Sequence, residues 1–213
     1  MGAGASAGAS VSAEFNRSRA LAKRIFNDKA TLKKLWTVLD FNGNGMVSLA
    51  EIDKMIILFN EANAYEGFFK GMNNKPALMR AYKRTIEGEG DGDAYVQRHE
   101  FTILLRNLYL YNQFWAVFDG IDGDDRRVDI NEFKAGVAKM GYNLTDEEAE
   151  ATFAKIDKNG GGQILFDEFC DYCMKAAGLG TNRIAVNFDE PEKIDPEELD
   201  IEECRDMVKQ MLG

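Results

Sequence analysis

Residues 40–51 carry oxygen-bearing groups at the spacing that one hard cation requires. In chain order these groups are Asp40, Asn42, Asn44, the backbone carbonyl of Met46, Ser48 and Glu51. They fill positions 1, 3, 5, 7, 9 and 12 of a loop whose turn residue, at position 6, is Gly45. Calcium takes six to eight oxygen ligands, so the stretch predicts a calcium-binding EF-hand loop, which we call loop 1.

Two amphipathic helices are expected on either side of loop 1. Apolar residues recur at helical spacing before and after it, namely Leu32, Leu35, Trp36, Leu39, Ile52, Met55, Ile56 and Phe59. Ser48 followed by Glu51 has the spacing of a capping box, so the second helix should begin at residues that also face the ion. The alternative is a polar turn between two helices.

The same pattern recurs three more times along the chain. Similar acidic loops are expected at 89–100 (loop 2), 121–132 (loop 3) and 157–168 (loop 4), each followed by a Phe. An apolar residue stands four positions before each closing Glu, where paired loops exchange a short β-bridge: Val47, Val96, Val128 and Ile164. The sequence therefore predicts an all-α protein with four EF-hand helix–loop–helix units, paired in two lobes, and extra helices at both ends.

The predicted organisation has four parts, and the loops differ in binding capacity. The parts are an N-terminal acylation and basic segment (1–27), EF-hand pair 1 (28–110), EF-hand pair 2 (111–178), and a linker with an acidic amphipathic helix (179–213). Loop 4 should bind more weakly than loop 1, through Asp157, Asn159, the Gln163 carbonyl and Glu168, because Gly161 and Leu165 offer no side-chain oxygen.

Loops 2 and 3 depart further from the binding pattern. In loop 2, Ala94 replaces the turn glycine. In loop 3, Asp122 stands one residue too close to Glu132, and Arg126 and Arg127 bring positive charge beside any ion. A scaffold that pairs helices is favoured for loop 3 over an ordinary metal site.

Specific stretches resemble the flagellar calcium-binding proteins of trypanosomatids, the calflagins, over roughly residues 28–178. The resemblance rests on Tyr95 to Phe101, Leu104-Leu105, Tyr109-Leu110-Tyr111, Phe114, Phe118 to Asp122, Asp157 to Gly160 and Phe166 to Phe169. It implies an N-terminally acylated calcium sensor that associates with membrane, and ligation in the third and fourth loops. This chain departs from that ligand pattern, because its first loop is complete and its third is short.

The chain start suits lipid attachment. Gly2, followed by Ser6, fits the N-myristoylation pattern, for which the alternative is a flexible tail of small residues. One acyl chain binds membranes marginally, so a basic patch would have to add attraction to anionic lipid, and the alternative is a solvated helix face. The candidate patch consists of Arg17, Arg19, Lys23 and Arg24.

The C-terminal part of the chain carries the pattern of an amphipathic helix. Asp195-Pro196 is a typical helix start, and an apolar stripe runs from Ile201 to Leu212. That helix could dock into a groove as an internal ligand or pack as ordinary core.

Composition narrows the function classes. A net charge of −10 argues against nucleic acid as a partner, and the sequence holds no apolar run long enough to span a membrane. With one histidine and no nucleophile–base set, we expect no enzyme. The leading prediction is a cytoplasmic calcium sensor with an unidentified protein target, which the resemblance would place at the inner face of the flagellar or plasma membrane. The alternative is a calcium buffer or a metal-independent EF-hand scaffold.

Overall fold

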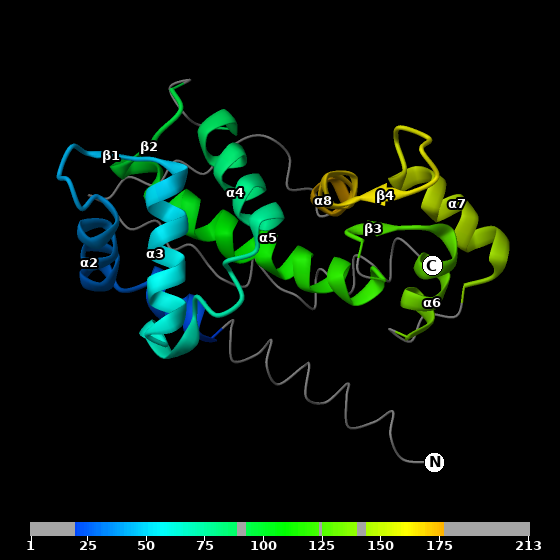
Figure 1. The fold of residues 1–213 in the computed structure, drawn as a ribbon, viewed down its shortest axis with the longest axis horizontal. Helices are drawn as coiled ribbons and strands as arrows, with labels where there is room; N and C mark the ends of the chain where they lie inside the picture. Colours follow the sequence, from blue (N-terminus) through cyan, green and yellow to red (C-terminus); the bar gives the residue numbers. More distant parts are fainter. Residues whose placement is uncertain (1–19, 89–92, 124, 140–143, 177–213) are drawn as a thin grey trace, which may run out of the picture. The chain divides into compact units, whose positions relative to one another are not determined.

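The computed structural model describes residues 20–88, 93–123, 125–139 and 144–176. The chain divides into two compact units, with the division in its central part between Tyr109 and Leu110 (Figure 1). We call them unit 1 and unit 2. Helix α5 (Phe101–Ile121) contributes to both. The predicted boundary after residue 110 remains a prediction.

Unit 1 contains loops 1 and 2 between short helices. After helical residues 20–26 its elements are α2 (Lys29–Leu39), β1 (Met46–Val47), α3 (Leu49–Glu61), the 3-10 helix η1 (Ala64–Gly67), α4 (Lys75–Gly88), β2 (Val96–Gln97), the 3-10 helix η2 (Arg98–Glu100) and the first half of α5. Unit 2 continues with β3 (Arg127–Val128), α6 (Ile130–Lys139), α7 (Asp146–Ile156), β4 (Ile164–Leu165) and α8 (Phe166–Ala176). The all-α class with EF-hand units is confirmed.

Local side-chain chemistry sets where these helices begin. Asp28 caps α2 by accepting hydrogen bonds from the Ala30 N–H at 3.0 Å and the Thr31 hydroxyl at 2.6 Å. The Thr31 hydroxyl is the main reason that the pKa of Asp28 lies below its usual range. Ser48 and Glu51 form the predicted capping box at the start of α3.

Each pair of loops is joined by a two-residue antiparallel bridge. In unit 1, Val47 pairs with Val96, and in unit 2, Val128 pairs with Ile164. All four side chains are buried, at 2% exposure or less. The predicted bridges are therefore present, and each one ties two loops back to back (Figure 1).

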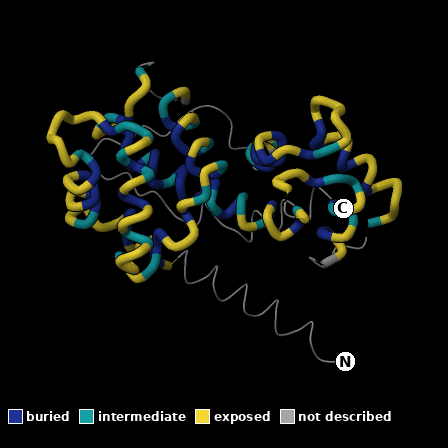
Figure 2. Tube along the Cα trace, viewed as in Figure 1, coloured by how far each residue is buried: buried dark blue, intermediate teal, exposed yellow. Residues whose placement is uncertain are grey.

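The helices bury aromatic side chains within each unit. In unit 1, Trp36 of α2 packs edge-on against Phe101, with ring centroids 5.4 Å apart. In unit 2, Phe118 of α5 contacts Phe166 and Phe169 of α8. Buried positions line the inward faces of the helices, whereas the tip of loop 1 and most of loop 4 are exposed (Figure 2).

Several predicted features lie outside the described residues. These are Gly2, Arg17, Arg19 and the C-terminal helix in 179–213. Of the predicted basic patch, Lys23 and Arg24 are described, and both are exposed. Among the helices that the structure describes, none combines the length and apolar character needed to cross a membrane.

Candidate metal centre

Loop 1 places an open carboxylate oxygen where an ion would lie. Asp40 follows the last residue of α2, and its N–H donates to the Trp36 carbonyl at 2.8 Å. Its Oδ2 accepts a hydrogen bond from the Gly45 N–H at 3.0 Å. Its Oδ1 is buried and has no hydrogen-bond partner. A buried carboxylate oxygen without a donor is unfavourable unless a cation approaches it.

The other side-chain ligands predicted for loop 1 form hydrogen bonds within the loop. The Asn42 amide nitrogen donates to Glu51 Oε1 at 3.1 Å, so the two halves of the loop are in contact. Asn42 Oδ1 and Asn44 Oδ1 accept from the N–H groups of Asn44 and Met46, at 3.0 and 2.9 Å. These contacts fold the first half of the loop and join it to Glu51; among the described residues the structure gathers no group of three or more acidic, His or Cys side chains that could hold a metal.

Glu51 has a second role in this arrangement. Its Oε2 accepts hydrogen bonds from the Ser48 N–H and hydroxyl, both at 2.8 Å, and so caps α3. To become a two-oxygen ligand, the carboxylate would have to exchange these contacts for the ion. Glu51 therefore serves both as the cap of α3 and as the candidate closing ligand of loop 1.

Backbone conformation supports the turn of loop 1. Gly43 and Gly45 have φ of +68° and +78°, in the left-handed region that side chains disfavour. In loop 4, Gly160 and Gly162 hold the matching positions with φ of +68° and +76°.

Loop 4 is built similarly but leaves less oxygen open. Both carboxylate oxygens of Asp157 accept backbone N–H groups, from Gly161 at 3.1 Å and Gly162 at 2.8 Å. Glu168 Oε1 accepts from the Asn159 amide nitrogen at 2.7 Å. Glu168 Oε2 accepts from the Leu165 N–H at 3.0 Å. The Gln163 side chain accepts from Arg127 at 3.1 Å, so only its carbonyl remains a candidate ligand.

From its first Asp to its closing Glu, loop 3 is one residue shorter than loops 1 and 4. Asp122 donates its N–H to the Phe118 carbonyl at 2.8 Å, the same helix-end contact that Asp40 and Asp157 make. Counting back from Glu132, Arg126 occupies the place of the turn glycine, and it adopts a left-handed φ of +65°. The contraction brings Gly123 so close that a Cβ there would lie 2.3 Å from Glu132 Oε1.

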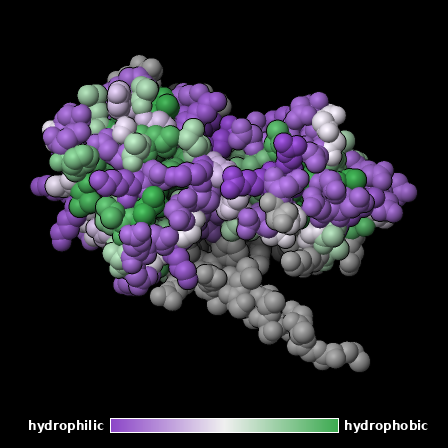
Figure 3. Space-filling view, in the orientation of Figure 1, coloured by the Kyte–Doolittle hydropathy of each residue, from purple (hydrophilic) through white to green (hydrophobic). Residues whose placement is uncertain are grey.

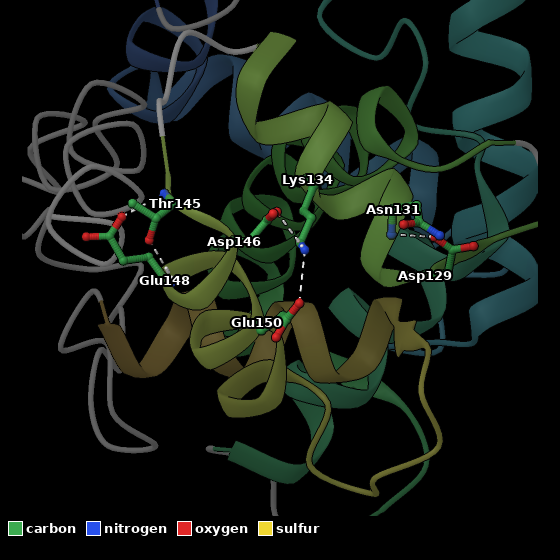
Figure 4. Close-up of polar contacts among 7 residues, drawn as sticks. All are labelled: Asp129, Asn131, Lys134, Thr145, Asp146, Glu148 and Glu150. Atoms are coloured by element: carbon green, nitrogen blue, oxygen red, sulfur yellow. Dashed lines mark hydrogen bonds and ion pairs between the residues drawn. The ribbon is translucent and has the colours of Figure 1, made fainter.

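The closing half of loop 3 caps helix α6. Asp129 Oδ1 accepts the Asn131 N–H at 2.7 Å (Figure 4). The same oxygen accepts the Glu132 N–H at 2.9 Å. Glu132 Oε2 accepts the Asp129 N–H at 2.9 Å. Both carboxylates therefore act as helix caps, as expected for a scaffold loop.

In loop 2 the structure describes residues 93–100. Asp93 accepts the Tyr95 N–H at 2.7 Å, and Glu100, which is 1% exposed, accepts the Gln97 N–H at 2.7 Å. The Tyr82 hydroxyl donates to the Ala94 carbonyl. Tyr82 of α4 thus holds the described part of loop 2 in place. Burial raises the pKa of Tyr82.

A lysine links the two EF-hands of unit 2, which sequence reasoning did not identify. Lys134 of α6 reaches Asp146 at 2.8 Å and Glu150 at 3.0 Å, both on α7 (Figure 4). These hydrogen bonds, that to Asp146 first, raise the pKa of Lys134. At the start of α7, Thr145 and Glu148 form a capping box. The hydrogen bonds with Thr145 lower the pKa of Glu148.

Comparisons with known proteins agree with this geometry. Residues 89–174 match the EF-hand domain pair family. The chain is 35% identical over 92 residues to a flagellar calcium-binding protein of Trypanosoma cruzi. The aligned region covers 42% of this chain and 43% of that protein. It is 24% identical over 156 residues to the probable calcium-binding protein CML27 of Arabidopsis thaliana, covering 73% and 84%.

A solved structure also aligns with the chain. It is a homolog of programmed cell death 6 protein from Leishmania major Friedlin, with 17% identity, a TM-score of 0.36, and coverage of 78% of this chain and 92% of that one. The chain spans less than half the length of the Trypanosoma cruzi relative, at 43%. Loop 1 lies outside residues 89–174, the range that the family matches.

Both units carry paired helix–loop–helix elements, and residues 89–174 match the EF-hand domain pair family. The chain is thus similar to the class of EF-hand calcium-binding proteins, which agrees with the predictions of a calcium ligand and of no enzyme. Within that class it is similar to the flagellar calcium-binding proteins of trypanosomes, which confirms the calflagin-like resemblance predicted from its motifs.

Proposed function

We propose that the protein binds calcium in loop 1 and acts as a calcium sensor. The proposed ligands are Asp40, Asn42, Asn44, the Met46 carbonyl, Ser48 and Glu51. The observation that carries the proposal is the buried Asp40 Oδ1, which has no hydrogen-bond partner while Oδ2 is held by Gly45. A calcium ion would give that oxygen the positive partner it lacks.

A second, weaker calcium site is proposed in loop 4, at Asp157, Asn159, the Gln163 carbonyl and Glu168. Both oxygens of Asp157 already accept N–H groups, and Leu165 at position 9 carries no oxygen. Water would have to complete the shell, so the affinity should be lower than in loop 1.

Switching would start at Glu51, which lies in the first turn of α3. When its carboxylate turns from Ser48 to the ion, α3 must move or rotate with it. Met55 and Ile56 are buried on that helix, whereas Leu58 is 51% exposed. Apolar residues gather on the surface of unit 1 (Figure 3). Movement of α3 would enlarge this apolar surface for a protein target.

Membrane association is proposed through acylated Gly2 together with Arg17, Arg19, Lys23 and Arg24. One acyl chain binds weakly, and basic residues near anionic lipid add on the order of 1 kcal/mol each. The similarity to flagellar proteins supports a cytoplasmic location at the inner face of the flagellar or plasma membrane.

A metal-independent scaffold is the second candidate. It is favoured by the closing glutamates, since Glu51, Glu132 and Glu168 all accept hydrogen bonds from the start of their own helices. Loops closed in this way can pair helices without an ion.

A calorimetric calcium titration with magnesium present tests the sensor against the scaffold. We expect one or two calcium ions to bind the full chain, with a rise in hydrophobic dye fluorescence as apolar surface is exposed. Binding without any dye response would indicate a buffer, and no binding would leave the scaffold. For the lipid role, a myristoylated preparation should bind anionic vesicles less as salt rises, and Gly2→Ala should lose this binding. Equal vesicle binding by Gly2→Ala would contradict acylation.

A further inference from the structure

Residues 20–26 cover an apolar surface of unit 1. Leu21, Ala22, Ile25 and Phe26 are 7%, 1%, 3% and 7% exposed, and they share one face of the helix. Phe26 packs edge-on against Phe68, with ring centroids 6.0 Å apart. The apolar face of residues 20–26 is therefore packed on unit 1 in the way that an amphipathic helix packs on a protein partner.

We propose that residues 20–26 are a displaceable internal ligand of unit 1, which covers the apolar surface around Phe68 until calcium binds loop 1. The helical stretch 20–26 is joined to α2 through Asn27 and Asp28, and Asp28 caps α2 as an independent helix start. Displacement of 20–26 therefore need not disturb α2. The calcium dependence of the displacement rests on the proposed function of loop 1.

An exposed ion pair joins this segment to the rest of unit 1. Arg24 forms an ion pair with Glu66 at 2.5 Å, and the two side chains are 59% and 58% exposed. Water and salt screen such exposed pairs, so the pair can open readily. Exposure of Lys23 on the same segment places a second positive charge at the surface.

The backbone around Glu66, the partner of Arg24, is strained. Asn63, Tyr65 and Glu66 have φ of +47°, +51° and +57°, although none of them is glycine. Side chains disfavour this left-handed region, and such residues persist only where surrounding contacts hold them. Glu66 is thus both the partner of Arg24 and part of a backbone segment that can relax once the contact opens.

A continuous path links this segment to loop 1. Helix α3 begins beside Glu51 at its loop end and finishes at Glu61, two residues before the strained segment. Near its end, Phe59 packs against Tyr65 and Phe69, with centroids 5.4 and 5.1 Å apart. A movement of α3 driven by ion binding would therefore be passed to Glu66 and to the seat of Phe26. Release would expose apolar surface and make Arg24 available to anionic lipid.

Hydrogen exchange of the full chain, followed by mass spectrometry, tests this proposal in two arms. In calcium-free protein, Arg24→Gln should speed exchange of the amides in 22–26 roughly two- to fivefold, the range expected for an exposed ion pair. Lys23→Gln is the matched control, because it removes a neighbouring charge without breaking the pair with Glu66, and should change exchange little. In wild type, calcium should speed exchange in 22–26 by about tenfold or more, since a detached short helix is marginal in water.

The outcomes separate this proposal from the proposed function. If 22–26 exchanges as slowly as the buried part of α5 in every variant and with calcium, the segment is permanent core and the proposal is overturned. If a parallel titration shows calcium binding while exchange stays unchanged, the displacement is wrong although the calcium site stands. If calcium does not bind, the proposed function fails, and the calcium-free comparison of Arg24→Gln with Lys23→Gln still decides whether the segment is detachable.

Discussion

Replacing Glu51 with Gln is the sharpest test of loop 1, because it changes the ion site while keeping the helix cap. Glu51 Oε2 accepts the Ser48 N–H at 2.8 Å, and a Gln oxygen can accept the same hydrogen bond. The substitution removes one of the two carboxylates of loop 1, the other being Asp40. It also replaces a two-oxygen ligand with a one-oxygen ligand.

The size of the effect follows from the ligand charge. An EF-hand sensor site with a Kd of about 1 μM binds with roughly 8 kcal/mol. If attraction scales with ligand charge, loss of one carboxylate of two removes about 4 kcal/mol, or roughly a thousandfold in affinity. At about 1 mM free calcium, wild type would gain ~4 kcal/mol of stability and Glu51→Gln only ~0.4 kcal/mol. For a unit of this size, the larger gain raises Tm by ~15–30 °C.

Thermal unfolding with and without calcium measures this difference, with magnesium as the competing ion. Glu61→Gln is the matched control, since it makes the same change at the exposed last residue of the same helix. We expect Glu61→Gln to keep the full calcium-induced rise in Tm. If calcium raises the Tm of Glu51→Gln as much as that of wild type, the assignment of the calcium site to loop 1 is refuted. If Glu132→Gln or Glu168→Gln abolishes the calcium-induced rise in Tm instead, the calcium site belongs to unit 2.

Three further predictions concern unit 2. Arg126→Gly should stabilise the protein by about 0.5–1 kcal/mol in chemical unfolding, because relief of a left-handed φ exceeds the added entropy of the unfolded chain; destabilisation would show that the guanidinium holds loop 3 together. Leu165→Ser supplies a hydroxyl at position 9 of loop 4 and should tighten calcium binding there severalfold by calorimetry, whereas unchanged affinity would contradict ligation by loop 4. Lys134→Met should lower the Tm of unit 2 at neutral pH, less so in high salt. Since folding raises the pKa of Lys134 above its usual value, its contribution to stability is full below that usual value and is lost as pH rises through the raised pKa. A difference that persists once Lys134 has lost its proton would contradict an ionic role.

The fold was predictable because its signals are local. Apolar spacing at Leu32, Leu35, Trp36 and Leu39 specifies one buried helix face, and all four side chains are buried in α2. The capping box joins Ser48 and Glu51, three positions apart, so it could be predicted without any knowledge of distant contacts. The β-bridges were predictable for the same reason, since each loop carries its own bridging residue at a constant offset from the closing Glu.

The candidate site was predictable in its ligands but not in its present hydrogen bonding. Spacing alone identifies Asp40 and Glu51 as members of one loop. It does not tell that both oxygens of Asp157 are held by backbone N–H groups whereas Asp40 keeps one open, because this depends on how each loop is folded.

By itself, the sequence determined the class of protein, the order of the loops and the one-residue contraction of loop 3. These depend on residue types at fixed short separations, which every chain conformation preserves. Only the tertiary structure decided that Arg126 takes the glycine place with a positive φ, that Lys134 joins α6 to α7, and that Arg24 meets Glu66. The last pair is separated by 42 residues, and such contacts arise only when packed apolar faces bring distant segments together.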